Sequence, residues 1–149
     1  MAIIVGTNSY ITISECNDIM AGFLNTAEWD NATDAVKEKA LREACSMMNT
    51  LNYIGTKTDS TQKLQFPRLY VSQGGWMKDV GVPDDIKIGQ AQMALCLLKP
   101  NMVKKIGIKS ESVNGIGSVT YEKAITEDVI FKPAYDYIGL WIEKAVALT

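Results

Sequence analysis

The run Gly55-Thr56-Lys57-Thr58 is the first place to look for chemistry, because Gly-Lys-Thr occurs in nucleotide-binding phosphate loops. Such a loop needs two glycines five residues apart and a lysine directly after the second. It also needs a strand before it and a helix after it. Here Thr56 separates Gly55 from Lys57, the first glycine is missing, and a helical pattern precedes the run. The spacing therefore argues against nucleotide binding at this motif.

The acidic residues form no recognisable catalytic or metal-binding pattern. Asp84-Asp85 and Glu122 with Glu127-Asp128 could be metal ligands, but their positions indicate helix-start and surface charges. The chain has no histidine, which excludes His-based acid–base catalysis, Ser-His triads and His-bearing zinc sites. We therefore expect no enzyme activity, no metal and no cofactor.

Composition indicates one soluble globular domain spanning residues 1–149, with 47% hydrophobic and 21% charged residues. The net charge of −2 argues mildly against a dedicated nucleic-acid binder, although DNA could still pass nearby. No apolar run reaches the roughly 18 residues of a membrane span, and no signal-peptide pattern opens the chain. Cys16, Cys45 and Cys96 lie among apolar residues at helical spacing, so we expect buried free thiols in a reducing cytoplasm.

The element that should organise the fold is a helix over residues 33–54. Thr33 is placed to cap it, and Gly55 stands where a helix commonly ends in a left-handed residue. Apolar residues three or four apart predict a buried face, which contains Val36, Ala40, Ala44, Met47, Met48 and Leu51.

Three further helices are predicted around this one. Thr12 and Glu15 form a capping box for a helix ending near Asn25, with Leu24 on its inward face. Pro83 opens a helix that Pro100 stops, and Pro133 opens a last helix reaching the C-terminus. Residues 2–5 should form a short strand or extended arm, and Trp29 should pack as a lid between helices. The predicted core comprises Ile19, Phe23, Val36, Leu41, Ala44, Met48, Leu51, Ile86, Met93, Leu97, Ile138 and Ile142.

Asn114-Gly115 predicts a β-hairpin over residues 110–121, because both turn positions need positive φ. Its strands are polar, so the ribbon is a candidate for pairing with a neighbouring subunit. Trp76 beside two glycines is either a packed loop anchor or a partner contact. The predicted fold class is mainly α: a small antiparallel helical bundle with one projecting β-hairpin.

A family resemblance is carried by Gly55-Thr56-Lys57-Thr58-Asp59, then Gln62, then Leu64-Gln65-Phe66-Pro67-Arg68. This pattern resembles the signature of a small tailed-phage family of head–tail connector (adaptor or head-completion) proteins, which are often described as DnaT-like single-stranded-DNA-binding proteins. Matches elsewhere extend the similarity to nearly the whole chain: Asn8-Ser9-Tyr10-Ile11-Thr12, Trp29-Asp30, Val82-Pro83, Lys109-Ser110-Glu111 and Val119-Thr120-Tyr121.

The resemblance implies a structural protein of the virion neck, assembled in the host cytoplasm. It would form a ring, dodecameric in the family, that joins the portal protein to tail or tail-completion (nozzle) proteins. DNA would pass through this ring without sequence-specific binding, and no membrane would be involved. Arg68 would hold the polar loop of residues 56–63 to the body or reach a neighbouring subunit. The expected interface residues are Lys57, Lys63, Arg68, Trp76, Lys109, Glu111, Asn114, Ile116 and Tyr121.

The alternative is a single-stranded-DNA-binding module, which needs a positive groove interleaved with stacking aromatic side chains. Lys104, Lys105, Lys109 and Tyr121 could supply part of one, although the basic run from 104 to 109 is also typical of a solvated face. Net charge and the expected burial of most aromatic residues count against this alternative. The sequence alone therefore favours the neck adaptor.

Overall fold

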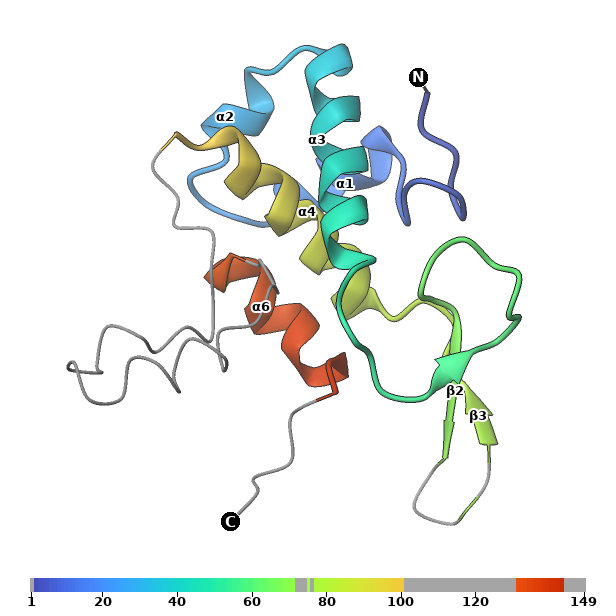
Figure 1. Cartoon of the computed structure of the whole chain (residues 1–149). Coiled ribbons are helices and arrows are strands. Elements are labelled where there is room, and N and C mark those ends of the chain that lie inside the picture. Colours follow the sequence, from blue (N-terminus) through green and yellow to red (C-terminus); the bar gives the residue numbers. More distant parts are fainter. Residues whose placement is uncertain (1, 72–74, 76, 101–130, 144–149) are drawn as a thin grey trace, which may run out of the picture.

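The fold is built around helix α4 (Asp84–Leu98), whose residues are buried on nearly every side. The computed structural model describes residues 2–71, 75, 77–100 and 131–143. Within this part, α1 (Ile13–Met20), α2 (Ala27–Asp30), α3 (Asp34–Met48) and α6 (Lys132–Ile138) all pack against α4 (Figure 1). An all-round apolar surface is expected of a helix enclosed in this way.

The helix starts follow the local sequence signals. Thr12 and Glu15 form the predicted capping box, and the Thr33 hydroxyl accepts a hydrogen bond from the Val36 amide. Pro83 is extended and immediately precedes α4, whose first turn carries Asp84 and Asp85. The bonds made by Thr12, Glu15 and Thr33 satisfy backbone donors at the starts of α1 and α3, which would otherwise be free.

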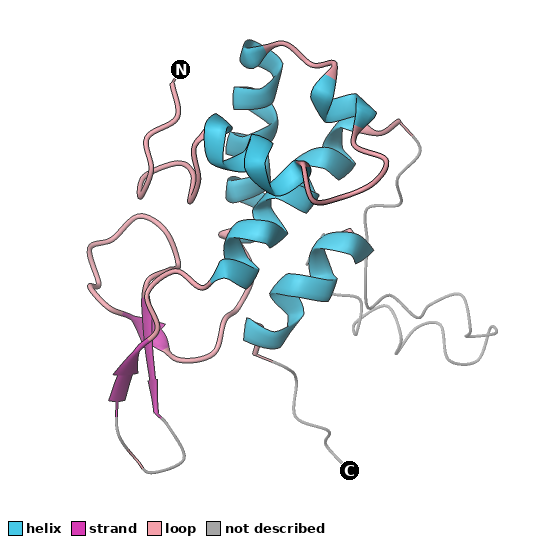
Figure 2. Cartoon of the chain, turned by 180° about the vertical axis from the view of Figure 1, so that it is seen from behind, coloured by secondary structure: helices cyan, strands magenta, loops and turns pink. Residues whose placement is uncertain are grey.

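A small antiparallel sheet was missed by the sequence analysis. Its order is β1 (Thr56–Lys57), β2 (Arg68–Val71) and β3 (Met77–Asp79), with Leu69 opposite both Thr56 and Asp79. Figure 2 shows the strands gathered at one end of the molecule, away from the helices. The strands are only two to four residues long, so periodicity could not reveal them.

Several predicted helix ends were wrong. Helix α1 stops at Met20, before Gly22 and a left-handed Asn25, and this leaves Leu24 88% exposed. Helix α3 stops at Met48, where the side chain of Asn49 bonds to a neighbouring loop in place of continuing the helix. Helix α6 ends at Ile138 and continues as a 3₁₀ turn, Gly139–Trp141, so the prediction of a helix to the C-terminus was wrong.

The core confirms most of the predicted set. Buried members are Leu41, Ala44, Met48, Leu51, Ile86, Met93 and Ile138, and half-buried ones are Ile19, Phe23, Leu97 and Ile142. Val36 is 40% exposed, so its place in the core was wrong; it sits in the first turn of α3, beyond the packed region. Trp29 is fully buried, and its indole nitrogen donates a hydrogen bond to the Asn17 side chain at 2.8 Å. All three cysteines are buried free thiols, as predicted.

The fold is therefore mainly helical with a small three-stranded sheet, whereas an antiparallel bundle is not confirmed. The predicted hairpin of residues 110–121 lies outside the described residues. Residues 2–5 form no strand, although Val5 makes one isolated bridge with Ser9.

Candidate functional site

Arg68 closes the loop that carries the family signature. Its Nε donates to the Ile54 carbonyl at 2.7 Å, and Nη2 donates to the carbonyls of Tyr53 (3.2 Å) and Gly55 (2.7 Å). Its Nη1 donates to both the carbonyl (3.2 Å) and the side chain (2.8 Å) of Gln65. These five bonds occupy the whole donor fork of the guanidinium, so Arg68 ties both ends of the loop together.

Arg68 is only 6% exposed, and its guanidinium carbon lies 5.9 Å from the ring centre of Tyr53 and 6.0 Å from that of Phe66. Loss of hydration lowers the pKa of Arg68, while nearby Tyr10, Tyr53 and Glu143 act in the opposite direction. Arg68 was expected either to hold the loop to the body or to reach a neighbouring subunit. Its contacts show that it holds the loop to the body.

Other signature residues also fix the loop from within. The Gln62 side-chain nitrogen donates to the carbonyls of Leu64 and Pro67, both at 2.8 Å, and its oxygen accepts from the Asp59 amide. The Asp59 carboxylate accepts from the amide and hydroxyl of Thr61, and these bonds lower the pKa of Asp59. The Phe66–Pro67 peptide is cis. The signature residues thus bond to one another within the loop.

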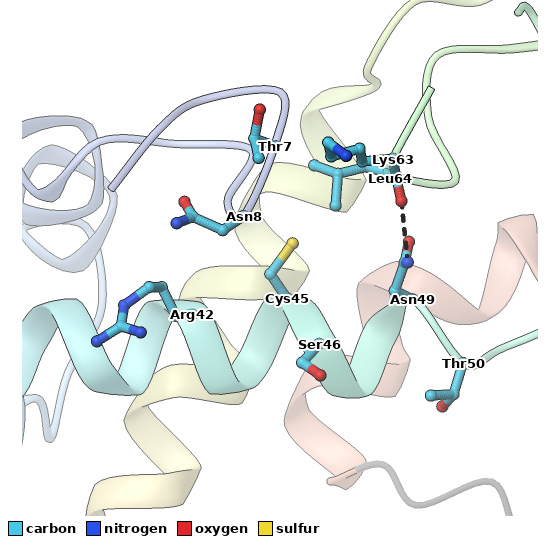
Figure 3. Close-up of a pocket in the computed structure, with 9 residues that line it drawn as sticks. All are labelled: Thr7, Asn8, Arg42, Cys45, Ser46, Asn49, Thr50, Lys63 and Leu64. Atoms are coloured by element: carbon cyan, nitrogen blue, oxygen red, sulfur yellow. Dashed lines mark hydrogen bonds between the residues drawn. The ribbon is translucent and has the colours of Figure 1, made fainter. Parts of the chain in front are cut away.

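This loop forms one wall of a groove of about 370 Å³ that runs along α3. Figure 3 shows α3 crossing the base of the groove, the N-terminal loop on one side and residues 63–64 on the other. The lining residues are polar for the most part: Thr7, Asn8, Arg42, Cys45, Ser46, Asn49, Thr50, Lys63 and Leu64.

The opposite wall is held by a buried polar residue. Gln90 of α4 is fully buried; its oxygen accepts from the Tyr10 amide at 2.9 Å, and its nitrogen donates to the Ser9 hydroxyl at 2.8 Å and the Leu41 carbonyl at 2.9 Å. Asn49 clamps the loop wall, since its side chain donates to the Lys63 carbonyl at 3.2 Å and accepts from the Gln65 amide at 2.9 Å. Both walls are thus fixed to the helices.

The groove is positively charged, because its lining includes Arg42 and Lys63 and no carboxylate. The Nε of Arg42 is buried and has no hydrogen-bond partner in the described part of the chain. Neither the Thr7 nor the Ser46 hydroxyl has a partner among the described residues, and both residues are exposed. Cations beside free hydroxyls are suited to binding an anion such as a phosphate group.

Aromatic stacking is not provided at this groove. Its lining contains no aromatic residue, and every aromatic side chain whose burial is described is buried or half-buried. Among the described residues, no group of three or more His, Cys, Asp or Glu side chains could hold a metal ion. Nor is any described helix long and apolar enough to cross a membrane.

Three of the predicted interface residues are described, and they have different surroundings. Lys63 lines the groove, Arg68 is buried behind the loop, and the Lys57 ammonium donates to the Gln62 carbonyl at 3.4 Å. The remaining predicted interface residues lie outside the described residues: Trp76, Lys109, Glu111, Asn114, Ile116 and Tyr121. So do Lys104 and Lys105 of the basic run.

The sequence analysis missed Arg42, Ser46 and Asn49. Their spacing of four and then three residues places them on one side of α3, which was a usable signal for a shared polar stripe. Nothing local in the sequence shows that two loops from other parts of the chain lie beside this stripe.

Comparison with known proteins gives a family. A family model described as "Putative DnaT-like ssDNA binding protein" matches residues 2–146. No curated protein and no solved structure matches the chain.

This match overturns the predicted role as a neck adaptor. The family description names single-stranded DNA as the ligand and names no portal, tail or virion. The predicted partners, namely the portal, the tail or nozzle proteins and further copies in a dodecameric ring, are therefore wrong, as is the assignment to head–tail connectors. The predicted passage of DNA through a channel agrees only loosely with the family description, which names DNA binding. Since the match covers nearly every residue, the chain belongs to the DnaT-like single-stranded-DNA-binding protein family.

Proposed function

We propose that this protein binds single-stranded DNA, without sequence preference, through backbone phosphates in the groove along α3. The observation that carries the proposal is a groove containing Arg42 and Lys63 and no carboxylate, in a chain whose net charge is −2. The groove is thus lined by two cations and no carboxylate, whereas the chain as a whole is weakly acidic. The family description supports the same ligand.

Arg42 is the first expected phosphate contact. Its Nε lacks an acceptor in the described structure, so the side chain gains a hydrogen bond if it turns toward a phosphate oxygen. The guanidinium can bind two phosphate oxygens at once, which fixes the orientation of the bound backbone.

Lys63 is the second expected contact, on the loop wall of the groove. Asn49 and Arg68 hold the loop on which it stands, so its position is set although its side chain is exposed. The hydroxyls of Thr7 and Ser46 can donate to further phosphate oxygens or to sugar oxygens. We assign these groups to phosphate and sugar oxygens, which carry no sequence information, and we therefore propose binding without sequence preference.

The absence of aromatic residues from the groove lining predicts strong salt dependence, because stacking would add a term that salt does not weaken. Each phosphate contact on a single strand contributes a slope of about −0.7 to a plot of log affinity against log salt. Loss of two contacts should therefore reduce the magnitude of this slope by about 1.4.

The test is fluorescence anisotropy of labelled 20-nucleotide oligo(dT) from 25 to 200 mM NaCl. We expect R42A/K63A to weaken binding and flatten the salt slope. The matched control is K78A/K132A, which removes the same charge from exposed Lys78 on β3 and from Lys132, whose side chain is 71% exposed on α6. Equal losses in both double variants would show that only net charge matters, and the groove assignment would be wrong.

We further propose that the chain is one domain and is not an enzyme, both on the grounds of sequence alone. Location in a virion likewise stays a prediction of the sequence.

A further inference from the structure

A second groove, of about 300 Å³, lies between α1 and the beginning of α4. Its apolar lining is formed by Ile11, which is fully buried, and by Ile19 and Ile88, which are half-buried. The groove shares no lining residue with the one along α3. Branched aliphatic surface is thus left partly uncovered at a second place on the described structure.

The charge around this groove is negative. Three carboxylates line it, those of Glu15, Asp18 and Asp84, together with the single cation Lys87. These carboxylates would repel single-stranded DNA and favour a positively charged ligand.

Two of the carboxylates have a structural reason to be present. Glu15 accepts the Thr12 amide in the capping box, and Asp84 lies in the first turn of α4, where negative charge is favourable. Asp18 has no such reason. It lies in the last turn of α1, where a negative charge is unfavourable, and its carboxylate has no hydrogen-bond or ion-pair partner among the described residues.

We propose that this groove docks a basic peptide segment of another protein, with an isoleucine or leucine flanked by lysine or arginine. The aliphatic side chain would cover Ile19 and Ile88, and the flanking cations would lie beside Asp18 and Asp84. An apolar contact ringed by charge is a common form of peptide recognition, with the charges setting specificity. Because the two grooves are separate, this docking does not depend on the proposed DNA binding.

The test uses the isotope-labelled full chain and a capped probe peptide, Lys-Ile-Lys-Ile-Lys, followed by NMR chemical shifts. We expect saturable shifts at Ile19 and Ile88 that weaken as salt is raised. Each of Asp18→Asn and Asp84→Asn should weaken binding about two- to fivefold, the range for an exposed ion pair. Asp34→Asn removes the same charge at an exposed residue outside the groove and should leave binding unchanged.

Two further peptides separate charge from apolar contact. Lys-Ser-Lys-Ser-Lys keeps the charge and Glu-Ile-Glu-Ile-Glu keeps the isoleucines, and we expect neither to bind. Binding of the serine peptide as tightly as the isoleucine peptide, or unchanged affinity in Asp18→Asn, would overturn the proposal. If the chain instead self-associates with rising concentration and Asp18→Asn abolishes this, the groove is an interface between copies and the proposed partner is wrong. Should Asp84→Asn fail to fold, Asp18→Asn and the peptide pair still decide the matter.

Discussion

Replacing Arg68 by alanine should destabilise the protein, because its guanidinium bonds to four residues around the signature loop. The substitution removes the donors for the carbonyls of Tyr53, Ile54, Gly55 and Gln65. Water can replace the guanidinium at Gly55, which is exposed, and in part at Gln65. Ile54 is half-buried, so its carbonyl would lose a partner that water replaces poorly.

An unsatisfied buried acceptor costs about 1–3 kcal/mol, so the loss at the Ile54 carbonyl predicts a fall of about 1–3 kcal/mol in the free energy of unfolding. Urea denaturation followed by tryptophan fluorescence measures this loss. The amides of Thr58 and Gln65, which bond to the Pro67 carbonyl and the Asn49 side chain, should also exchange hydrogen faster.

Two control variants separate charge from geometry. Arg68→Lys keeps the positive charge but lacks the planar fork, so we expect it to lose most of the same stability. Lys63→Ala removes an exposed cation from the same loop and should change the unfolding free energy by less than about 0.5 kcal/mol. A loss below about 1 kcal/mol in Arg68→Ala, with unchanged exchange, would refute the view that the guanidinium holds the loop.

Three more predictions concern the interior. Met48→Ala should lower the free energy of unfolding, measured by urea denaturation, by about 2–5 kcal/mol, because Met48 is fully buried. Leu97 is half-buried, so Leu97→Ala should lower it less, and the reverse order would mean that the packing is misassigned. Gly55→Ala should unfold the loop, seen as faster amide exchange there, because Gly55 has φ +79° and a Cβ would overlap the Leu69 carbonyl. Burial raises the pKa of the Cys16 thiol to about 12, so above pH 9 the unfolded chain releases a proton that the folded chain keeps. The free energy of unfolding should therefore fall between pH 9 and 12, and Cys16→Ala should make this fall smaller. An identical fall in the variant would contradict the contribution of the Cys16 thiol.

Local patterns were sufficient wherever a structural signal is contained within a few residues. The capping box of Thr12 and Glu15 and the cap at Thr33 satisfy amides three residues away, so their types and spacing alone predict them. Periodicity likewise placed Met48 and Met93 in the core, since one apolar face must be buried. The same reasoning failed for Val36 and Leu24, because periodicity shows which side of a helix faces inward and does not show where the helix stops or how far its neighbours extend.

The sequence by itself determined that this is a mainly helical protein with buried free thiols and a distinctive loop ending at Arg68. Only the tertiary structure decided the role of Arg68 in that loop. Its guanidinium donates hydrogen bonds to carbonyls 13 to 15 residues earlier in the chain, and these bonds form only when the loop folds back on itself. The groove along α3 depends on the same kind of contact, because its walls come from residues 7–8, 42–50 and 63–64. No local sequence pattern shows which distant segments will come together. The charge of the groove could therefore not be predicted, because it depends on which side chains those segments bring to it.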